Sequence, residues 1–309
     1  MTITAKPGAP AEAEEPLVVD SAAAALGTER SSAGMVVRRF LGHRMAVAGL
    51  VIVVLMVLMA VLAPYLAPHD PNQIFGSFEA PPSRDHRLGT DAVGRDVLSR
   101  LIFGARVSIS VGVGAVAVYV VIGVLLGLLA GYYGRWADMV IMRVTDVFMS
   151  FPYFMVILIL VSVLGPSLFT IIFVIGLLAW PMIARLVRGS VLSIKQSDYV
   201  QAGVTLGYTA PRIMFRHILP NALSPIIVNA TFGVAQAIIL ESGLSFLGMG
   251  VRPPAASWGN MLSGAQSITV LSSQPWIWIP PGLMILFAVL SINFVGDGLR
   301  DALESRSHK

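Results

Sequence analysis

Residues 107–134 read VSISVGVGAVAVYVVIGVLLGLLAGYYG and contain no charged side chain. A helix needs about 20 predominantly apolar residues to cross the hydrocarbon core of a bilayer, and this stretch exceeds that length. Further charge-free runs that meet the same requirement lie at 45–67, 147–184, 217–240 and 253–296. The sequence therefore predicts an all-α integral membrane protein.

The number of spans follows from breaks within these runs. The run 147–184 is interrupted by Leu164-Gly165-Pro166, which is a turn signal. The run 253–296 begins with Pro, Ser, Gly and Asn, so only its second half is expected to cross. Charged residues make up 12% of the chain, against about 25% in soluble domains. We expect six spans, near 45–66, 107–131, 147–164, 168–187, 222–241 and 276–296.

The distribution of basic residues predicts the orientation of these spans. Cytoplasmic loops carry an excess of Lys and Arg, and an internal N-terminus places most of the 21 basic residues inside. With six spans, both termini are then cytoplasmic. Residues 1–35 have no apolar signal region and are rich in Ala, Glu, Pro and Ser, so they are expected to form a disordered cytoplasmic tail. Residues 36–309 would form the transmembrane domain.

The segment 84–106 argues locally against this orientation, because it carries five arginines on the expected outer side. Its apolar residues fall on one helical face, which predicts a short amphipathic helix lying at the outer interface. These apolar residues are Val97, Leu98, Leu101, Ile102 and Ala105. The arginines would then lie beside lipid phosphates or beside the nearby carboxylates of Asp85, Asp91 and Asp96.

The longest predicted cytoplasmic loop, 188–221, includes the polar stretch DYVQAGVTLGYTAPRIMFRHILPN at 198–221. Asp198 followed by Gln201 resembles a capping box, so a helix is expected to begin at Asp198. Gly203 and Gly207 would let a partner surface approach the backbone of that helix closely. On composition alone, a surface hairpin without a partner explains the stretch equally well.

A second helix is expected in the same loop. Pro211 is favoured in a first turn, and Pro220 would end this helix or begin the next span. Arg212, Arg216 and His217 would lie on its polar side. A DNA-binding helix-turn-helix is disfavoured, because both ends of the loop are tethered near the bilayer and its charge is modest. No nucleic-acid partner is expected.

Several stretches of the chain resemble a known family. Gln201-Ala202-Gly203, Gly207 and RHILPN at 216–221 resemble the EAA loop of ABC-importer permeases. From about residue 36 onward the chain resembles the second permease of the dipeptide, oligopeptide and nickel importers. The matching stretches are HRLGTDAVGRDVLSRLIFGARVS (86–108), MRVTDVFMSFP (142–152), ESGLSFLGMGVRPPAASWGNML (241–262) and NFVGDGLRDALE (293–304).

The resemblance implies a type I ABC-importer permease fold and a coupling helix that contacts a cytoplasmic ATPase. The residues it assigns to this contact are Asp198, Tyr199, Gln201, Ala202, Gly203, Gly207, Arg212, His217 and Pro220. Gln201 stands where the family usually has Glu, so we expect the loop to keep its fold while any ionic contact with the ATPase is weakened.

The partners implied by the resemblance are a second permease, two ATPase subunits that bind ATP and Mg, and an extracytoplasmic substrate-binding protein. The chain would be a multi-pass protein of the cell membrane. Its expected cargo is di- or oligopeptides, with nickel or glutathione as alternatives. An ion-driven secondary transporter is a rival interpretation, but the sequence contains no convincing internal repeat.

Catalytic chemistry is not expected in this chain. None of its three lysines follows a glycine, which excludes a Walker A phosphate loop. The sequence has no cysteine, and its five histidines lack close ligand spacing, so no metal site and no bound cofactor are predicted. Ser245 and His217 lie at opposite ends of a predicted span, too far apart to act as nucleophile and base.

A few side chains near or within the spans invite a structural or functional interpretation. Arg143 and Asp146, at i,i+3 spacing, are predicted to form a structural ion pair. Uncharged polar groups at membrane depth are costly to expose to lipid, so Asn229, Gln236 and Asn293 are candidates for pathway or partner contacts. Glu241, at the outer end of the fifth predicted span, is a further candidate, for contact with a neighbouring loop or the binding protein, although solvation at the interface explains it as well. The glycines of 107–134 predict tight helix packing, with a hinge as the alternative; they are Gly112, Gly114, Gly123, Gly127 and Gly131.

Overall fold

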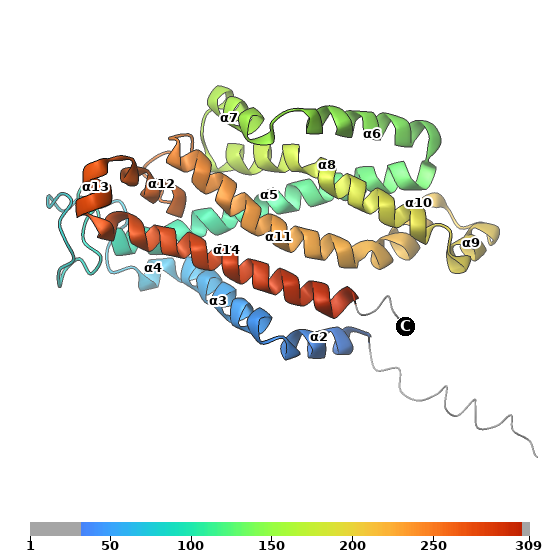
Figure 1. Ribbon diagram of the computed structural model, residues 1–309, viewed down its shortest axis with the longest axis horizontal. Helices are drawn as coiled ribbons and strands as arrows, with labels where there is room; N and C mark the ends of the chain where they lie inside the picture. Colours follow the sequence, from blue (N-terminus) through green and yellow to red (C-terminus); the bar gives the residue numbers. More distant parts are fainter. Residues whose placement is uncertain (1–31, 305–309) are drawn as a thin grey trace, which may run out of the picture.

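The computed structural model describes residues 32–304, which form a bundle of long helices (Figure 1). Four helices run along the long axis of the bundle: α5 (Val97–Tyr133), α8 (Leu168–Ile194), α11 (Leu219–Phe246) and α14 (Pro275–Glu304). The helix α3 (Arg44–Val61) packs against α14. The shorter helices are α2 (Ser32–Gly42), α4 (Ala63–Leu66), α6 (Arg135–Ser150), α7 (Tyr153–Leu164), α9 (Asp198–Thr205), α10 (Ala210–Arg212), α12 (Trp258–Leu262) and α13 (Ile268–Ser273).

Within the described part of the chain, five helices are long and apolar enough to cross a membrane. They are α3, α5, α8, the continuous helix Ala210–Phe246 and α14. The pair α6 and α7 passes the same criterion together but is bent by 84°, so the number of candidate spans is five or six. The described part of the chain is therefore all-helical, with several candidate membrane spans.

The predicted span 147–164 is not one continuous helix, because the chain breaks at Phe151 and Pro152 between α6 and α7. A proline disfavours the helical conformation at the residue before it, and Phe151 is indeed extended, with φ −94° and ψ 145°. Pro152 also ends the backbone ladder because it has no N–H. The break turns α7 away from α6, and both short helices lie over α8 (Figure 1).

Small residues let α5 and α8 pack closely along most of their length. A Cβ added at Gly127 would lie 2.6 Å from the carbonyl oxygen of Ala184, and one added at Gly131 would lie 2.6 Å from Cβ of Val191. Gly123 approaches α8 in a similar way. Without a hydrophobic driving force in lipid, such close contact is a main source of helix association. The prediction of tight packing by these glycines is confirmed.

The predicted amphipathic helix at 97–105 is not a separate interfacial helix. These residues form the first turns of α5, and Val97, Leu101 and Ala105 are buried in the core. The indole of Trp258 packs against this part of α5 and donates to the carbonyl of Leu101 at 3.1 Å. In the folded chain, α3, α12 and Leu88 of the preceding loop cover this apolar face.

The first described helix, α2, begins at Ser32 and so overlaps the predicted disordered tail 1–35. The rest of that predicted tail lies outside the described residues. From α2 the chain enters α3, whose first turn is capped by His43: its Nδ1 accepts from the backbone N–H of Ala46 at 3.1 Å.

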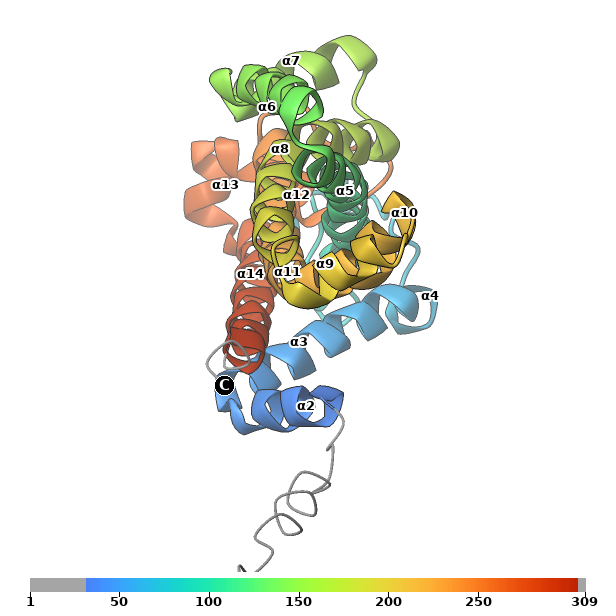
Figure 2. The same cartoon turned by 90° about the vertical axis from the view of Figure 1, so that its right-hand side faces the viewer.

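The two ends of the bundle differ. One end carries α9 and α10, and the other carries α12, α13 and the 67–96 loop (Figure 1). Viewed from the α9 end, α6 and α7 lie on one side of the bundle and α2 and α3 on the other (Figure 2). The long helices α5, α8, α11 and α14 connect these two ends.

Candidate functional site

The helix α9 begins where the sequence predicted, but it is not held by the predicted capping box. Ser197 is the N-cap residue, and no side chain caps the first turn. Instead, the side-chain amide of Gln201 donates to the carbonyl oxygen of Lys195 at 2.8 Å, at the end of α8. The glutamine thus fastens α9 to the helix before it.

The end of α9 explains why residue 207 is glycine. The N–H of Gly207 donates to the carbonyl of Val204 at 2.9 Å, and the N–H of Tyr208 donates to the carbonyl of Gly203 at 3.0 Å. This pair of bonds is a Schellman motif, which places a left-handed residue after the helix. Gly207 has φ +78° and a hypothetical Cβ would touch nothing within 4 Å. Backbone conformation within the chain, rather than close packing, therefore requires glycine at position 207.

The ring of Tyr208 fills the centre of this loop. It lies 3.2 Å from the Cβ position of Gly203, so the predicted close approach at that glycine is made by the chain's own tyrosine. The guanidinium of Arg212 lies 4.0 Å over the same ring, and the imidazole of His217 stacks on it with centroids 5.6 Å apart. Gly203, Arg212 and His217, all predicted to belong to the ATPase contact, therefore contact Tyr208. The sequence analysis did not include Tyr208. Its position directly after the helix-ending glycine was a usable signal, because an apolar contact commonly closes this motif.

The second predicted helix is continuous with the following span. The chain is helical from Ala210 to Phe246, passing through a π-helical turn at Ile213–Ile218. Pro220 lies at the start of α11, directly after the π-helical turn, so it begins the next span, which is the second of the two predicted alternatives. The side-chain amide of Asn221 donates to the hydroxyl of Tyr199 at 3.2 Å, which joins α9 to α11. The turn at 206–209 and this hydrogen bond therefore both connect α9 to the long helix that follows.

The other side of the loop is fastened to α5 and α6. The ammonium of Lys195 donates to the carbonyl of Tyr132 at 2.6 Å. Arg188 on α8 makes a two-pronged ion pair with Asp138 on α6, and Nη2 of Arg188 lies 2.6 Å from Oδ2. Bidentate geometry of this kind fixes orientation as well as charge. The loop is therefore built on a rigid base.

The predicted ion pair on α6 has an additional partner. Nη1 of Arg143 lies 3.8 Å from Asp146, whereas Nη2 of Arg185 on α8 lies 2.6 Å from the same carboxylate. All three side chains are exposed, so these contacts add little stability on their own. The shorter contact joins two helices rather than two turns of one helix.

Apolar side chains are exposed at the tip of the loop. Leu206 is 71% exposed and Val204 is 49% exposed, and Phe215 is exposed nearby. Asp198 and Ala202 are also exposed on α9. Apolar groups that gather on a surface with a polar rim commonly mark a protein-binding surface. The loop therefore combines a rigid interior with a surface suited to a partner.

The four predicted polar residues of the spans have different surroundings. Glu241 is fully buried, accepts from the hydroxyl of Ser245 at 2.7 Å and lies next to Gly259. Its side chain contacts the chain's own α12 region, and a pathway or partner contact at this residue stays a prediction. Gln236 is exposed, and Asn229 and Asn293 are half-buried. Contact of these three residues with the pathway or with a partner subunit stays a prediction.

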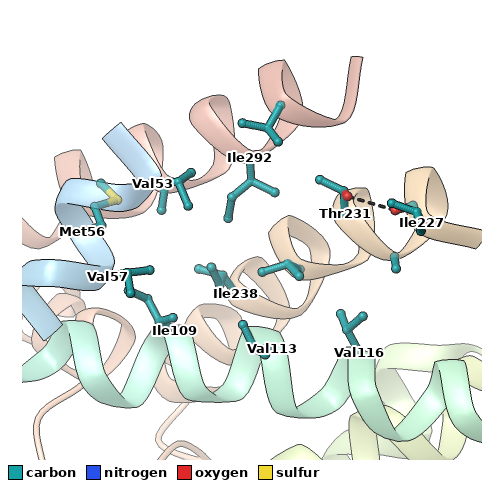
Figure 3. A pocket seen from close by; sticks show the side chains of 14 residues that line it. Val53, Met56, Val57, Ile109, Val113, Val116, Ile227, Thr231, Ile238 and Ile292 are labelled. Carbon is teal, nitrogen blue, oxygen red and sulfur yellow. Dashed lines mark hydrogen bonds between the residues drawn. The ribbon is translucent and has the colours of Figure 1, made fainter. Parts of the chain in front are cut away.

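A groove opens between α3, α5, α11 and α14, with a volume of about 350 Å³. Figure 3 shows that side chains from these helices point into it. The hydroxyl of Thr231 donates to the carbonyl of Ile227 at 2.9 Å and is thereby satisfied. The remaining lining is apolar, including Val53, Met56, Ile109, Val113, Ile238 and Ile292. A peptide backbone would lose its hydrogen bonds to water here without replacement, so the groove suits hydrocarbon better.

The fold defines the class of this protein as a multi-span helical membrane protein with a helical loop at one end. Residues 123–309 match the family described as binding-protein-dependent transport system inner membrane component. Residues 31–82 match the N-terminal transmembrane domain of oligopeptide transport permease C. The chain belongs to the family of binding-protein-dependent transport permeases, and it is a multi-pass protein of the cell membrane.

Named relatives agree with this assignment. The chain is 43% identical to a putative peptide permease protein of Brucella suis biovar 1 (strain 1330), over 87% of this chain and 89% of the relative. It is 41% identical to the oligopeptide transport system permease protein OppC of Bacillus subtilis (strain 168), over 88% of each chain. It is also 41% identical to the glutathione transport system permease protein GsiD of Pectobacterium atrosepticum, over 87% of this chain and 89% of the relative.

A solved structure shares the fold. The inward-facing MetNI methionine ABC transporter contains a chain that superposes with a TM-score of 0.53 at 20% identity. The match covers 66% of this chain and 96% of that chain. The two chains therefore share the arrangement of their helices over the matched region.

Proposed function

We propose that this chain is one of two permease subunits of an ABC importer and that it moves peptides across the cell membrane. It would pair with a second, similar permease, receive cargo from an extracytoplasmic binding protein, and bind ATPase subunits on the cytoplasmic side. ATP and Mg would be held by those ATPases, and this chain would itself be non-catalytic. The relatives named for peptide, oligopeptide and glutathione transport support this cargo class, since glutathione is itself a tripeptide.

In this proposal the bent pair α6 and α7 counts as one span, which makes six and places both termini in the cytoplasm. The ends of α8 and α11 that flank α9 would then be cytoplasmic. The basic residues near these ends, including Arg185, Arg188 and Lys195, agree with the excess of positive charge expected there.

The observation that carries the proposal is the construction of the α9 loop. Tyr208 fastens the interior of the loop, and the chain continues as helix from Ala210 through the membrane. Because the loop is stiff, closure of the ATPases would displace α11 instead of being absorbed by a flexible linker. The exposed apolar residues Val204 and Leu206 would make the contact.

The test replaces both exposed residues together, as Val204→Asp with Leu206→Asp, in the co-expressed importer. Two buried charges at an interface cost several kcal/mol, so the ATPases should no longer co-purify with the permease and transport should be lost. Ile268→Asp is the matched control, since Ile268 is 83% exposed and lies on α13 at the other end of the bundle. Retention of the ATPases by the double variant would refute the assigned contact.

A further inference from the structure

The loop 67–96 at the end of the bundle opposite α9 brings together residues that are far apart in the sequence. His69 follows α4, His86 lies within the loop, and Asp96 is the N-cap of α5. Each offers a ligand atom, and these atoms all lie within 4.8 Å of one another. The sequence predicted no metal site because the spacing of these residues along the chain gives no recognisable pattern. Folding of the loop brings them together.

The carboxylate of Asp96 is fully buried and held in one orientation. Its Oδ2 accepts from the backbone N–H of Ser99 at 2.8 Å and from the Ser99 hydroxyl at 2.7 Å. Its Oδ1 lies 3.0 Å from Nδ1 of His86. One oxygen is thus engaged by the cap of α5, and the other is directed at the imidazole.

The imidazole of His69 is fixed through contacts outside the cluster. Its Nε2 lies 3.0 Å from the carbonyl oxygen of Asp85, and its backbone N–H donates to the hydroxyl of Ser99 at 3.1 Å. A carbonyl oxygen only accepts, so Nε2 carries the proton, and in the neutral ring Nδ1 has the free lone pair. Metal-binding histidines are usually oriented by such a hydrogen bond from their second nitrogen.

An aromatic side chain shields the two histidines. The ring of Phe75 meets the imidazole of His69 edge-on with centroids 4.9 Å apart, and that of His86 with centroids 4.7 Å apart. The two imidazoles lie 5.2 Å apart between centroids. An apolar wall beside a polar cluster limits access of water and strengthens charge interactions within it.

We propose that His69, His86 and Asp96 bind a divalent transition-metal ion, with Zn²⁺ the best fit, at the end of the bundle opposite α9. Two imidazoles and one carboxylate are a common three-ligand set for zinc, with water in the fourth position. The 3.0 Å between the ligand atoms of His86 and Asp96 is close to the roughly 3.3 Å edge of a tetrahedron with zinc bond lengths.

The ion would lie between Nδ1 of His86 and Oδ1 of Asp96, in place of the hydrogen-bonding proton. The ring proton of neutral His86 would then be carried by Nε2. The imidazole of His69 would move slightly toward the ion and supply the third protein ligand. Imidazole ligands disfavour Mg²⁺ and Ca²⁺, which take oxygen ligands. The bound ion would join the end of α4, the loop and the start of α5 into one unit. This inference stands independently of the proposed transport function.

The test uses the full chain purified in detergent, stripped with EDTA, and titrated with Zn²⁺ in competition with a chromophoric chelator. One equivalent should bind tightly. His69→Gln and Asp96→Asn should each weaken this affinity by about 100-fold or more, since even loss of an outer-shell partner costs 10- to 100-fold. Asn is as good an N-cap as Asp, so Asp96→Asn removes the ligand charge while the start of α5 is kept.

The controls are Asp85→Asn, whose contact to His69 is made by the backbone, and His43→Gln, which replaces the N-cap residue of α3. Both should bind Zn²⁺ like the unmodified chain. Co²⁺ in place of Zn²⁺ should give the intense visible spectrum of a four-coordinate site, a measurement that needs no variant. Absence of a stoichiometric site in the unmodified chain, a Co²⁺ spectrum typical of six-coordinate aqueous ion, or undiminished binding by both ligand variants would each overturn the proposal.

Discussion

Replacement of Tyr208 by alanine should loosen the α9 loop without unfolding the bundle. The ring makes a cation–π contact with Arg212, worth about 0.5–1 kcal/mol at an exposed site. Its stacking on His217 is worth about 0.5–1.5 kcal/mol. Together these contacts predict a loss of about 1–2.5 kcal/mol, which raises the local opening equilibrium roughly 5- to 60-fold.

Hydrogen exchange of the loop amides measures this change directly. The N–H groups of Gly207 and Tyr208, which are bonded to the end of α9, should exchange faster by that factor in Tyr208→Ala. Amides in the middle of α5 and α8 should be unaffected. Tyr208→Phe keeps the ring and should exchange like the unmodified chain.

The same variant tests the role of stiffness in transport. In the reconstituted importer, Tyr208→Ala should hydrolyse ATP while moving less cargo for each ATP consumed, because a loosened loop absorbs the displacement of the ATPases. Unchanged exchange at Gly207 and residue 208 in the alanine variant, together with unchanged coupling, would refute the reasoning.

Three further predictions concern packing, backbone conformation and charge. Gly127→Ala should destabilise the protein by about 1–3 kcal/mol in thermal unfolding in detergent, because the new methyl group would lie 2.6 Å from a backbone oxygen of α8. Gly189→Ala is the control: nothing lies within 4 Å of its Cβ position, so this variant should be neutral or stabilising in the same assay. Gly207→Ala should lower the local stability measured by hydrogen exchange by about 1–2 kcal/mol, and Gly207→Asn should lower it less, since Asn tolerates positive φ. Equal effects of the two variants would contradict the explanation that the left-handed backbone conformation requires glycine. Arg188→Lys should cost about 1 kcal/mol or less, since both partners are partly exposed, and a double-mutant cycle with Asp138→Asn should give a coupling energy that shrinks in high salt.

The sequence was sufficient for features that depend on local composition. Long apolar runs located the major spans, and the glycines of α5 predicted its close contact with α8. The start of α9 at Asp198 was also predicted, although the reason given for it was wrong. In each case the property is a direct consequence of residues adjacent in sequence or on one helical face.

Features that depend on contacts between distant segments could not be predicted in this way. The buried state of Glu241 depends on α12, which follows it by a loop. The apolar face of Val97, Leu101 and Ala105 looks the same whether lipid or protein covers it. The break at Phe151 differs from these features, because the restriction that Pro152 places on the preceding residue is local and can be predicted from the sequence.

In the proposed importer, the α9 loop faces the cytoplasm and contacts an ATPase. The chain has no cysteine, so a single cysteine placed at an exposed position is a unique label. Leu206→Cys should react with a membrane-impermeant maleimide in inside-out vesicles stripped of the ATPase subunits, and those subunits should protect it when added back. It should stay unlabelled in right-side-out vesicles, where Ile74→Cys, at the other end of the bundle and 58% exposed, should react. Labelling of Leu206→Cys from the outside, or no protection by the ATPases, would contradict the account.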